Sequence, residues 1–299
     1  MGYRIIYIEQ SQQLRLYLDN LKVETERGEL TFPLSDIQTL IIDNNRTNLS
    51  VRLINELSNH NVCTILCGID HLPNCQLLPI NGHFAQSGNI LRQITWHEQI
   101  KKKLHKEIVK GKITNQIAIM TKYKCPDSSI DMLVKFREEV EDGDLGNREG
   151  LAAKVYFRSL FGPAFVRFES DVVNAGLNYG YSIFRSLLAS VIVSKGYLPN
   201  LGIFHRGKEN MFNLADDLIE VFRPVVDDYV REYLYDSVLF SSEDREGLIR
   251  LSTGRLQYNF MTQTVGNTAA LYFENILSCI EKNSVEDFLF PDCQISYDI

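Results

Sequence analysis

The stretch NLADDLIEVFRPVVD, residues 213–227, determines how the second half of the chain is interpreted. Its apolar residues recur at helical spacing on one face, and the other face carries Asp216, Asp217 and Glu220. Pro224 has no N–H to donate to the carbonyl of Glu220, so a kink is predicted there. Crowded carboxylates repel one another unless water or a cation screens them. The kinked acidic helix therefore indicates a cation site, and a solvated helix face is the alternative.

Helical periodicity continues on both sides of this stretch. Apolar residues repeat with a period of about 3.6 residues, and glycines and prolines separate the repeating segments. The predicted helices cover residues 90–122, 128–141, 148–161, 171–195, 213–240, 243–260 and 267–282. We interpret the Leu177–Tyr181 run, LNYGY, as part of a packed core helix with a tight glycine contact, with DNA contact as the alternative. The second half is predicted to be an all-α domain.

The first 80 residues follow a different pattern. Short runs of alternating or continuous apolar residues lie between turn-rich segments, which is typical of strands. The predicted strands cover residues 3–8, 14–18, 21–23, 37–42 and 62–67, and one helix follows Asn48 or Ser50. Pro79, Gly82 and Gly88 mark a linker. We predict an α+β protein with a β-rich domain at residues 1–80, a linker at 81–91 and an α-helical domain at 92–299.

The charge is distributed unevenly. The 299 residues include 31 Lys and Arg and 38 Asp and Glu, for a net charge of −7. Residues 92–124 nevertheless hold nine basic and two acidic side chains, whereas residues 212–299 hold six basic and sixteen acidic ones. The basic stretch contains Lys101, Lys102, Lys103, Lys106, Lys110 and Lys112, interspersed with Trp96, His97 and His105. It is a candidate phosphate-binding surface, with a solvated helix face as the alternative.

Several protein classes are excluded by what the sequence lacks. No apolar run approaches the roughly 20 residues of a membrane span, and the N-terminus does not read as a signal peptide, so we expect a cytoplasmic protein with no membrane contact. The common nucleotide-binding, zinc-protease and α/β-hydrolase motifs are missing. We interpret Cys63, Cys67 and Cys75, near His71, as free thiols and not as a zinc site.

Two further residues join the acidic helix as candidates. Glu149 opens a helix after Asn147, and its face also carries Ala152 and Tyr156, although a first-turn acid can simply complement the helix dipole. His205 lies in a glycine-containing loop, GIFHRGKEN. One imidazole with two or three carboxylates suits Mg²⁺ or Mn²⁺. Such a site fits phosphoryl transfer, in which Arg206, Lys208 or Arg223 would bind negative charge.

Three motifs in order resemble one known family. They are REGLAAKVYF at 148–157, NAGLNYGYSIFRS at 174–186 and HRGKENMFNLADDLIEVFRP at 205–224. They are similar to the CRISPR-associated spacer-acquisition integrases, which are also metal-dependent DNA endonucleases (the Cas-one family), and most closely to its type II members. The resemblance implies an N-terminal β-sandwich, a linker and an all-α helical catalytic domain. It also implies that Glu149, His205 and Glu220 are catalytic metal ligands, with Asp217 as a further acid in or beside the ligand set.

The resemblance implies a reaction and partners as well. The 3′-OH of a short DNA fragment would attack a phosphodiester at a repeat boundary, with Mg²⁺ or Mn²⁺ as cofactor. Expected partners are double-stranded DNA, both as spacer precursor and as repeat array, a second copy contacted through the β domain, and a dimer of the small second adaptation protein between two such homodimers. The type II effector nuclease and an accessory DNA-end-binding protein are further candidates. The expected DNA-binding residues are Lys101, Lys102, Lys103, Lys106, Arg206, Lys208 and Arg223.

Two alternatives use the same residues differently. A stand-alone, structure-selective nuclease of DNA repair would have the same metal site and would cleave branched DNA without the small partner. A non-catalytic DNA-binding scaffold would leave the acids as a solvated face, with no metal binding that depends on Glu149, His205 and Glu220.

Overall fold

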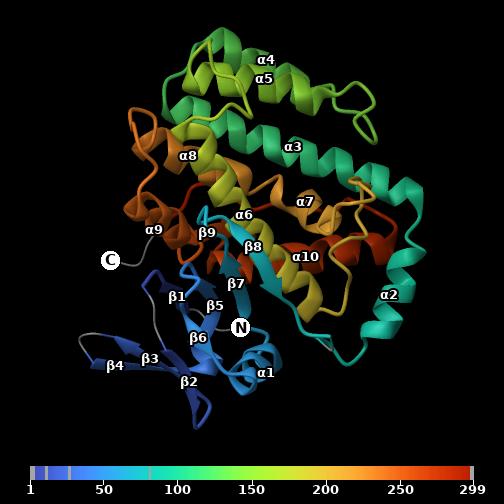
Figure 1. Ribbon diagram of the computed structural model, residues 1–299. Helices are drawn as coiled ribbons and strands as arrows, with labels where there is room; N and C mark the ends of the chain where they lie inside the picture. The colour runs from blue at the N-terminus through green and yellow to red at the C-terminus, as the bar shows by residue number, and fades with distance from the viewer. Residues whose placement is uncertain (1–3, 11–12, 26–27, 81, 297–299) are drawn as a thin grey trace.

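Eight strands near the N-terminus form two sheets that pack face to face (Figure 1). The computed structural model describes residues 4–10, 13–25, 28–80 and 82–296, so Tyr3 of the first predicted strand and residue 81 of the predicted linker lie outside it. The first sheet has the order β1 (Arg4–Ile8), β5 (Ile37–Ile42), β7 (Cys63–Cys67), β8 (Pro73–Leu77). The second has the order β4 (Gly28–Pro33), β3 (Asn20–Thr25), β2 (Gln13–Tyr17), β6 (Asn48–Leu49). The predicted β-sandwich is confirmed.

Strand β5 explains how the sandwich is joined to the rest of the molecule. All six of its residues are buried, which is the pattern of a strand covered on both faces. Leu40 and Ile42 pack between the two sheets with Leu21 of β3, whereas Ile41 points to the other face and belongs to the core of the helical part. Helix α1 (Val51–Asn59) follows, and the Ser50 hydroxyl accepts a hydrogen bond from Leu53 N at 3.2 Å, as the sequence predicts.

The remainder of the chain is mostly helical. Helix α6 runs through the middle of this part, and α3, α4 and α5 pack against one another on one side of it (Figure 1). Gly180 of α6 lets α8 and α9 approach, because an added Cβ would lie 2.4 Å from Val226 Cγ1. The helices are α2 (Gln86–Ile94), α3 (Glu98–Lys122), α4 (Asp127–Glu138), α5 (Arg148–Phe161), α6 (Val172–Ser194), α7 (Asn213–Ile219), α8 (Arg223–Tyr233), α9 (Ser242–Leu251) and α10 (Val265–Lys282).

Three predicted helices differ from the structure. The predicted helix 90–122 is interrupted between α2 and α3, and α2 overlaps most of the predicted linker. The predicted helix 213–240 is interrupted at residues 220–222, and Pro224 occupies the first turn of α8, where a missing N–H costs no hydrogen bond. The predicted helix 243–260 ends with α9, and a hairpin of β9 (Arg255–Tyr258) and β10 (Met261–Thr264) follows. Among the described residues, no helix is long and apolar enough to cross a membrane.

Candidate active site

Glu149 is presented by the first turn of α5, and its carboxylate is not needed there as a cap. The side chain of Asn147 accepts from Gly150 N at 3.2 Å, and Asp144 accepts from Arg148 N and Glu149 N at 2.8 and 3.0 Å. Because these two residues cap the exposed amides, the Glu149 carboxylate is free to turn toward α3. There, Glu149 Oε1 lies 2.6 Å from Lys112 Nζ.

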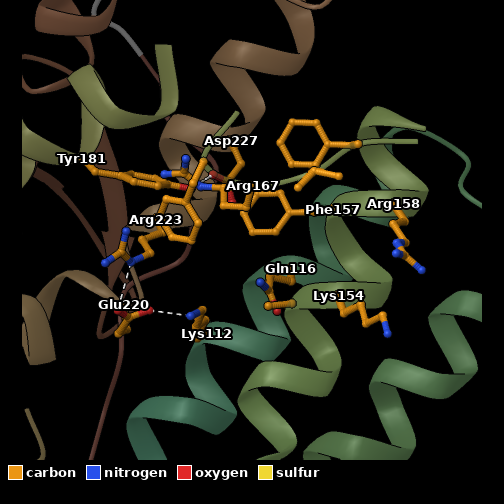
Figure 2. Close-up of a pocket in the computed structure, with 14 residues that line it drawn as sticks. Lys112, Gln116, Lys154, Phe157, Arg158, Arg167, Tyr181, Glu220, Arg223 and Asp227 are labelled. Atoms are coloured by element: carbon orange, nitrogen blue, oxygen red, sulfur yellow. Dashed lines mark hydrogen bonds and ion pairs between the residues drawn. The ribbon is translucent and has the colours of Figure 1, made fainter. Parts of the chain in front are cut away.

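Glu220 lies directly after α7, at the interruption that precedes Pro224. It is buried, and its two oxygens contact two different cations: Oε2 is 2.5 Å from Lys112 Nζ and Oε1 is 2.9 Å from Arg223 Nε (Figure 2). Burial alone would raise the pKa of Glu220, but Arg223 and Lys112 outweigh it and lower the pKa to about 2. Glu220 is therefore ionised at neutral pH.

Lys112 is the residue that joins these two acids. Sequence reasoning grouped it with the surface lysines of the basic stretch, and that interpretation is wrong: it is buried, as are Trp96 and His105. Burial opposes a charged amine, but Glu149 and Glu220 outweigh this effect and raise the pKa of Lys112. A signal was available in the sequence, because Lys112 follows Leu104 and Ile108 at four-residue spacing on the buried face of α3.

His205 is held by Asp217, which lies on α7. The Asp217 carboxylate accepts hydrogen bonds from Ile203 N, Phe204 N and His205 N, at 2.5, 3.1 and 3.0 Å. It also contacts His205 Nδ1 at 2.7 Å, which raises the pKa of the imidazole. Nε2 is therefore the ring nitrogen that remains for a ligand, and Asp217 orients the ring as carboxylates do for metal-ligating histidines. With both oxygens engaged in this way, Asp217 fits a supporting position better than a ligand position.

His105 completes the site and was not identified from the sequence. Its ring stacks on Phe204 with centroids 3.6 Å apart and planes 7° apart, so α3 supports the loop that carries His205. His105 Nε2 lies 4.0 Å from Glu149 Oε2, while Nδ1 is buried without a hydrogen-bond partner. Burial lowers the pKa of His105, which favours the neutral ring.

The donor set fits a hard divalent cation in its chemistry. Glu149 and Glu220 provide carboxylate oxygens, which Mg²⁺ and Mn²⁺ prefer as ligands. The Nε2 of His205 provides a nitrogen donor, which Mn²⁺ also accepts. Over the part of the chain that the structure describes, no three His, Cys, Asp or Glu side chains stand in a metal-binding group. The ammonium of Lys112 contacts both Glu149 and Glu220.

A pocket of about 530 Å³ opens beside these residues, with Lys112, Glu220 and Arg223 in its wall (Figure 2). Its lining combines aromatic rings with cations. Deep in the pocket, Tyr181 donates a hydrogen bond to the buried Asp227, and Arg223 lies over the Tyr181 ring, 4.5 Å from its centroid. The remaining lining residues are Gln116, Ala153, Lys154, Phe157, Arg158, Phe165, Val166, Arg167 and Phe168.

The predicted DNA-binding residues lie in three settings. Lys101, Lys102, Lys103 and Lys106 are at least partly accessible in the first half of α3, where Lys106 Nζ lies 3.5 Å from an oxygen of Asp142. Arg206 and Lys208 are exposed in the loop of His205, and Arg206 pairs with Glu98 at the start of α3, which also lies 3.6 Å from Lys101. Arg223 is turned inward to Glu220. Glu98 thus places the start of α3, with Lys101, next to the loop of Arg206.

The sandwich and helical part together form an architecture seen in solved structures. A CAS1 protein from Thermotoga maritima superposes with a TM-score of 0.75 at 18% identity, covering 93% of this chain and 97% of that one. A casposase bound to integration product superposes with a TM-score of 0.70 at 18% identity, covering 95% and 92%. At these identities the likeness shows the fold alone.

Sequence comparison identifies the family. The family model described as CRISPR associated protein Cas1 matches residues 6–253. A CRISPR-associated endonuclease Cas1 from Neisseria meningitidis serogroup C is 37% identical over 227 residues, which cover 76% of this chain and 74% of that protein. The chain belongs to the Cas1 family of CRISPR-associated proteins, and the resemblance seen in the sequence is confirmed.

Proposed function

We propose that this protein is a metal-dependent DNA integrase and endonuclease of CRISPR adaptation, which joins the 3′-OH of a short DNA fragment to repeat-boundary DNA. The observation that carries the proposal is the convergence of Glu149 and Glu220 on one point, next to the loop of His205, whose Phe204 stacks on His105, which lies 4.0 Å from Glu149. Three separate segments supply these side chains. Two carboxylates and an imidazole gathered from separate segments beside a pocket supply the donor types that Mg²⁺ or Mn²⁺ binds.

The residues of the site would have three roles: binding the metal, orienting a ligand and binding negative charge. Glu149, Glu220 and the Nε2 of His205 would hold Mg²⁺ or Mn²⁺, which supplies polarisation of the scissile phosphodiester when bound. Asp217 would keep Nε2 directed toward that place by holding Nδ1 and the three backbone amides of the loop. Arg223, at the wall of the pocket, would bind the negative charge of the reacting phosphate.

The proposed partners follow from the family and from the charge. Double-stranded DNA would lie along the accessible lysines of α3 and the loop of Arg206 and Lys208, because these cations are accessible and Glu98 contacts both Lys101 and Arg206. We propose that the protein acts in the cytoplasm as a homodimer through the β-sandwich, and that two homodimers flank a dimer of the small second adaptation protein. The type II effector nuclease and an accessory DNA-end-binding protein remain proposed partners.

A joining assay tests the reaction. The protein, with the small partner, Mn²⁺ and repeat DNA, is expected to join a fragment with a 3′-OH and not one with a 3′-dideoxy end. Glu149→Gln and Glu220→Gln should each abolish joining, whereas Glu209→Gln, an exposed acid in the loop of His205, should not. Joining that survives both active-site substitutions would contradict the proposal.

Two other outcomes would favour the alternatives. Cleavage of branched DNA without the small partner, together with no joining, would indicate a stand-alone nuclease. DNA binding with no Mn²⁺ binding in calorimetric titration would indicate a non-catalytic scaffold.

A further inference from the structure

The carboxylates of Glu149 and Glu220 are bridged by an ammonium group that belongs to the chain itself. Lys112 Nζ lies 2.6 Å from Glu149 Oε1 and 2.5 Å from Glu220 Oε2, and its side chain is only 10% exposed. The second oxygen of Glu220 is occupied by Arg223 Nε at 2.9 Å. Of these two cations, Lys112 is the one whose charged group contacts both carboxylates.

The charges of this group already cancel. Lys112 and Arg223 carry two positive charges, and Glu149 and Glu220 carry two negative ones. Both carboxylates therefore satisfy the need for a counter-ion without any metal. Adding a divalent cation beside an ammonium that stays in place would bring like charges within a few ångströms at a partly buried site, which is unfavourable.

Lys112 has room to move away. Its side chain also lines the pocket of about 530 Å³ beside the site, and that pocket contains the carboxylate of Asp227 as another acceptor. A lysine has a flexible four-carbon stem and a compact charge, so it can withdraw from between two acids without moving the helix that carries it. Arg223, which lies over the Tyr181 ring, is more constrained.

We propose that Lys112 is a positioning residue that holds Glu149 and Glu220 together in the metal-free protein and must withdraw from between them when Mg²⁺ or Mn²⁺ binds. Lys112 thereby lowers the affinity for metal and keeps the two ligands aligned until metal arrives. This inference rests on the metal-dependent function proposed above.

Calorimetric titration of Mn²⁺ tests the inference. Lys112→Met keeps the bulk of the side chain and removes its charge, so we expect it to bind Mn²⁺ about tenfold more tightly than the natural sequence or better. The metal-free variant should melt at a lower temperature, and Mn²⁺ should raise its melting temperature by more. Lys122→Met is the matched control, because Lys122 is also on α3 but pairs with Asp228 at 2.7 Å. It should leave Mn²⁺ affinity unchanged.

Each outcome is decisive. A merely structural lysine would weaken Mn²⁺ binding when replaced, so equal or weaker binding by a folded Lys112→Met protein overturns the inference. If that variant does not fold alone, Mn²⁺ should restore its fold, and failure to do so also overturns it. If the natural sequence binds Mn²⁺ and joins DNA, such a failure leaves the proposed function intact. If neither protein binds Mn²⁺, both proposals fail.

Discussion

Helix α3 carries lysines in two contrasting settings. In its first half, Lys106 pairs with Asp142 at 3.5 Å, and the two side chains are 30% and 47% exposed, so such an ion pair contributes about 0–1 kcal/mol. Fewer than two turns after Lys106, Lys112 is buried between two carboxylates, where removal of one partner costs about 3–5 kcal/mol. The same residue type on the same helix thus serves two purposes, and the environment decides which.

Removing the imidazole of His205 should produce the largest effect. His205→Ala is expected to lower strand joining on the order of 1000-fold or more, because a proposed metal ligand is lost, while DNA binding persists. The measurement is a joining assay with Mn²⁺ beside a DNA-binding titration. His60→Ala, an exposed histidine that ends α1, is the control. Full joining by His205→Ala would remove it from the proposed site.

Reversing the charge of the lysines in the first half of α3 should weaken DNA binding and leave metal binding unchanged. Combined Lys101→Glu, Lys102→Glu and Lys103→Glu are expected to weaken DNA binding about tenfold or more and to reduce the slope of log affinity against log salt by about 1 per lost phosphate contact. Mn²⁺ affinity should not change, because these residues do not touch Glu149 or Glu220. Lys135→Glu, on an exposed part of α4, is the control. An unchanged salt slope would mean that the three lysines are only solvated.

Changing Asp217, the acid behind His205, should have a smaller effect than removing His205 itself. Asp217→Asn should weaken Mn²⁺ binding about 10–100-fold, because the imidazole loses the carboxylate that orients it. Asp216→Asn is the neighbouring control: its carboxylate accepts from Asn210 Nδ2 at 2.7 Å and does not contact the ring. Calorimetry compares the two variants. A larger loss for Asp216→Asn would show that the roles of these acids have been assigned in the wrong order.

The smallest predicted effect concerns stability against pH. Burial raises the pKa of Asp227 from 3.8 to about 6, so the native state holds this proton more tightly than the unfolded chain does. The contribution of Asp227 to stability is complete below pH 3.8 and is lost as the pH rises through about 6. The free energy of unfolding, measured with urea from pH 4 to 7, should change less with pH for Asp227→Asn than for the natural sequence. Asp228→Asn, which changes the partner of Lys122, should keep the natural slope in this range.

Much of the fold could be predicted from local patterns. Strands β1, β2, β3, β5 and β7 follow from period-two or continuous apolar runs, and α1, α5 and α6 follow from caps and helical spacing. The missed strands β4 and β8 have mostly accessible residues, so little apolar pattern marks them. The β9–β10 hairpin was missed because Asn259 and Phe260 form its turn at positive φ without a glycine.

The candidate site was predictable only in part. The residue types of Glu149, His205 and Glu220, their order along the chain and the interruption before Pro224 could all be inferred from the sequence, because motifs and helix breakers act locally. The sequence could not show which side-chain atoms form hydrogen bonds or ion pairs. Asp217 adjoins Asp216 and carries the same charge, yet only Asp217 is buried against the loop amides and contacts the imidazole of His205, whereas Asp216 accepts from Asn210 Nδ2.

The sequence by itself determined the β-rich and helical parts, the family and the three chemically competent side chains. Tertiary structure alone decided that Lys112 meets Glu149 across 37 positions and Glu220 across 108. Those contacts depend on how α3, α5 and α7 pack, and packing determines which charges lose their water. In the sequence, Lys112 resembles the solvated lysines near it. It acts as a counter-ion inside the protein because it is buried between two acids.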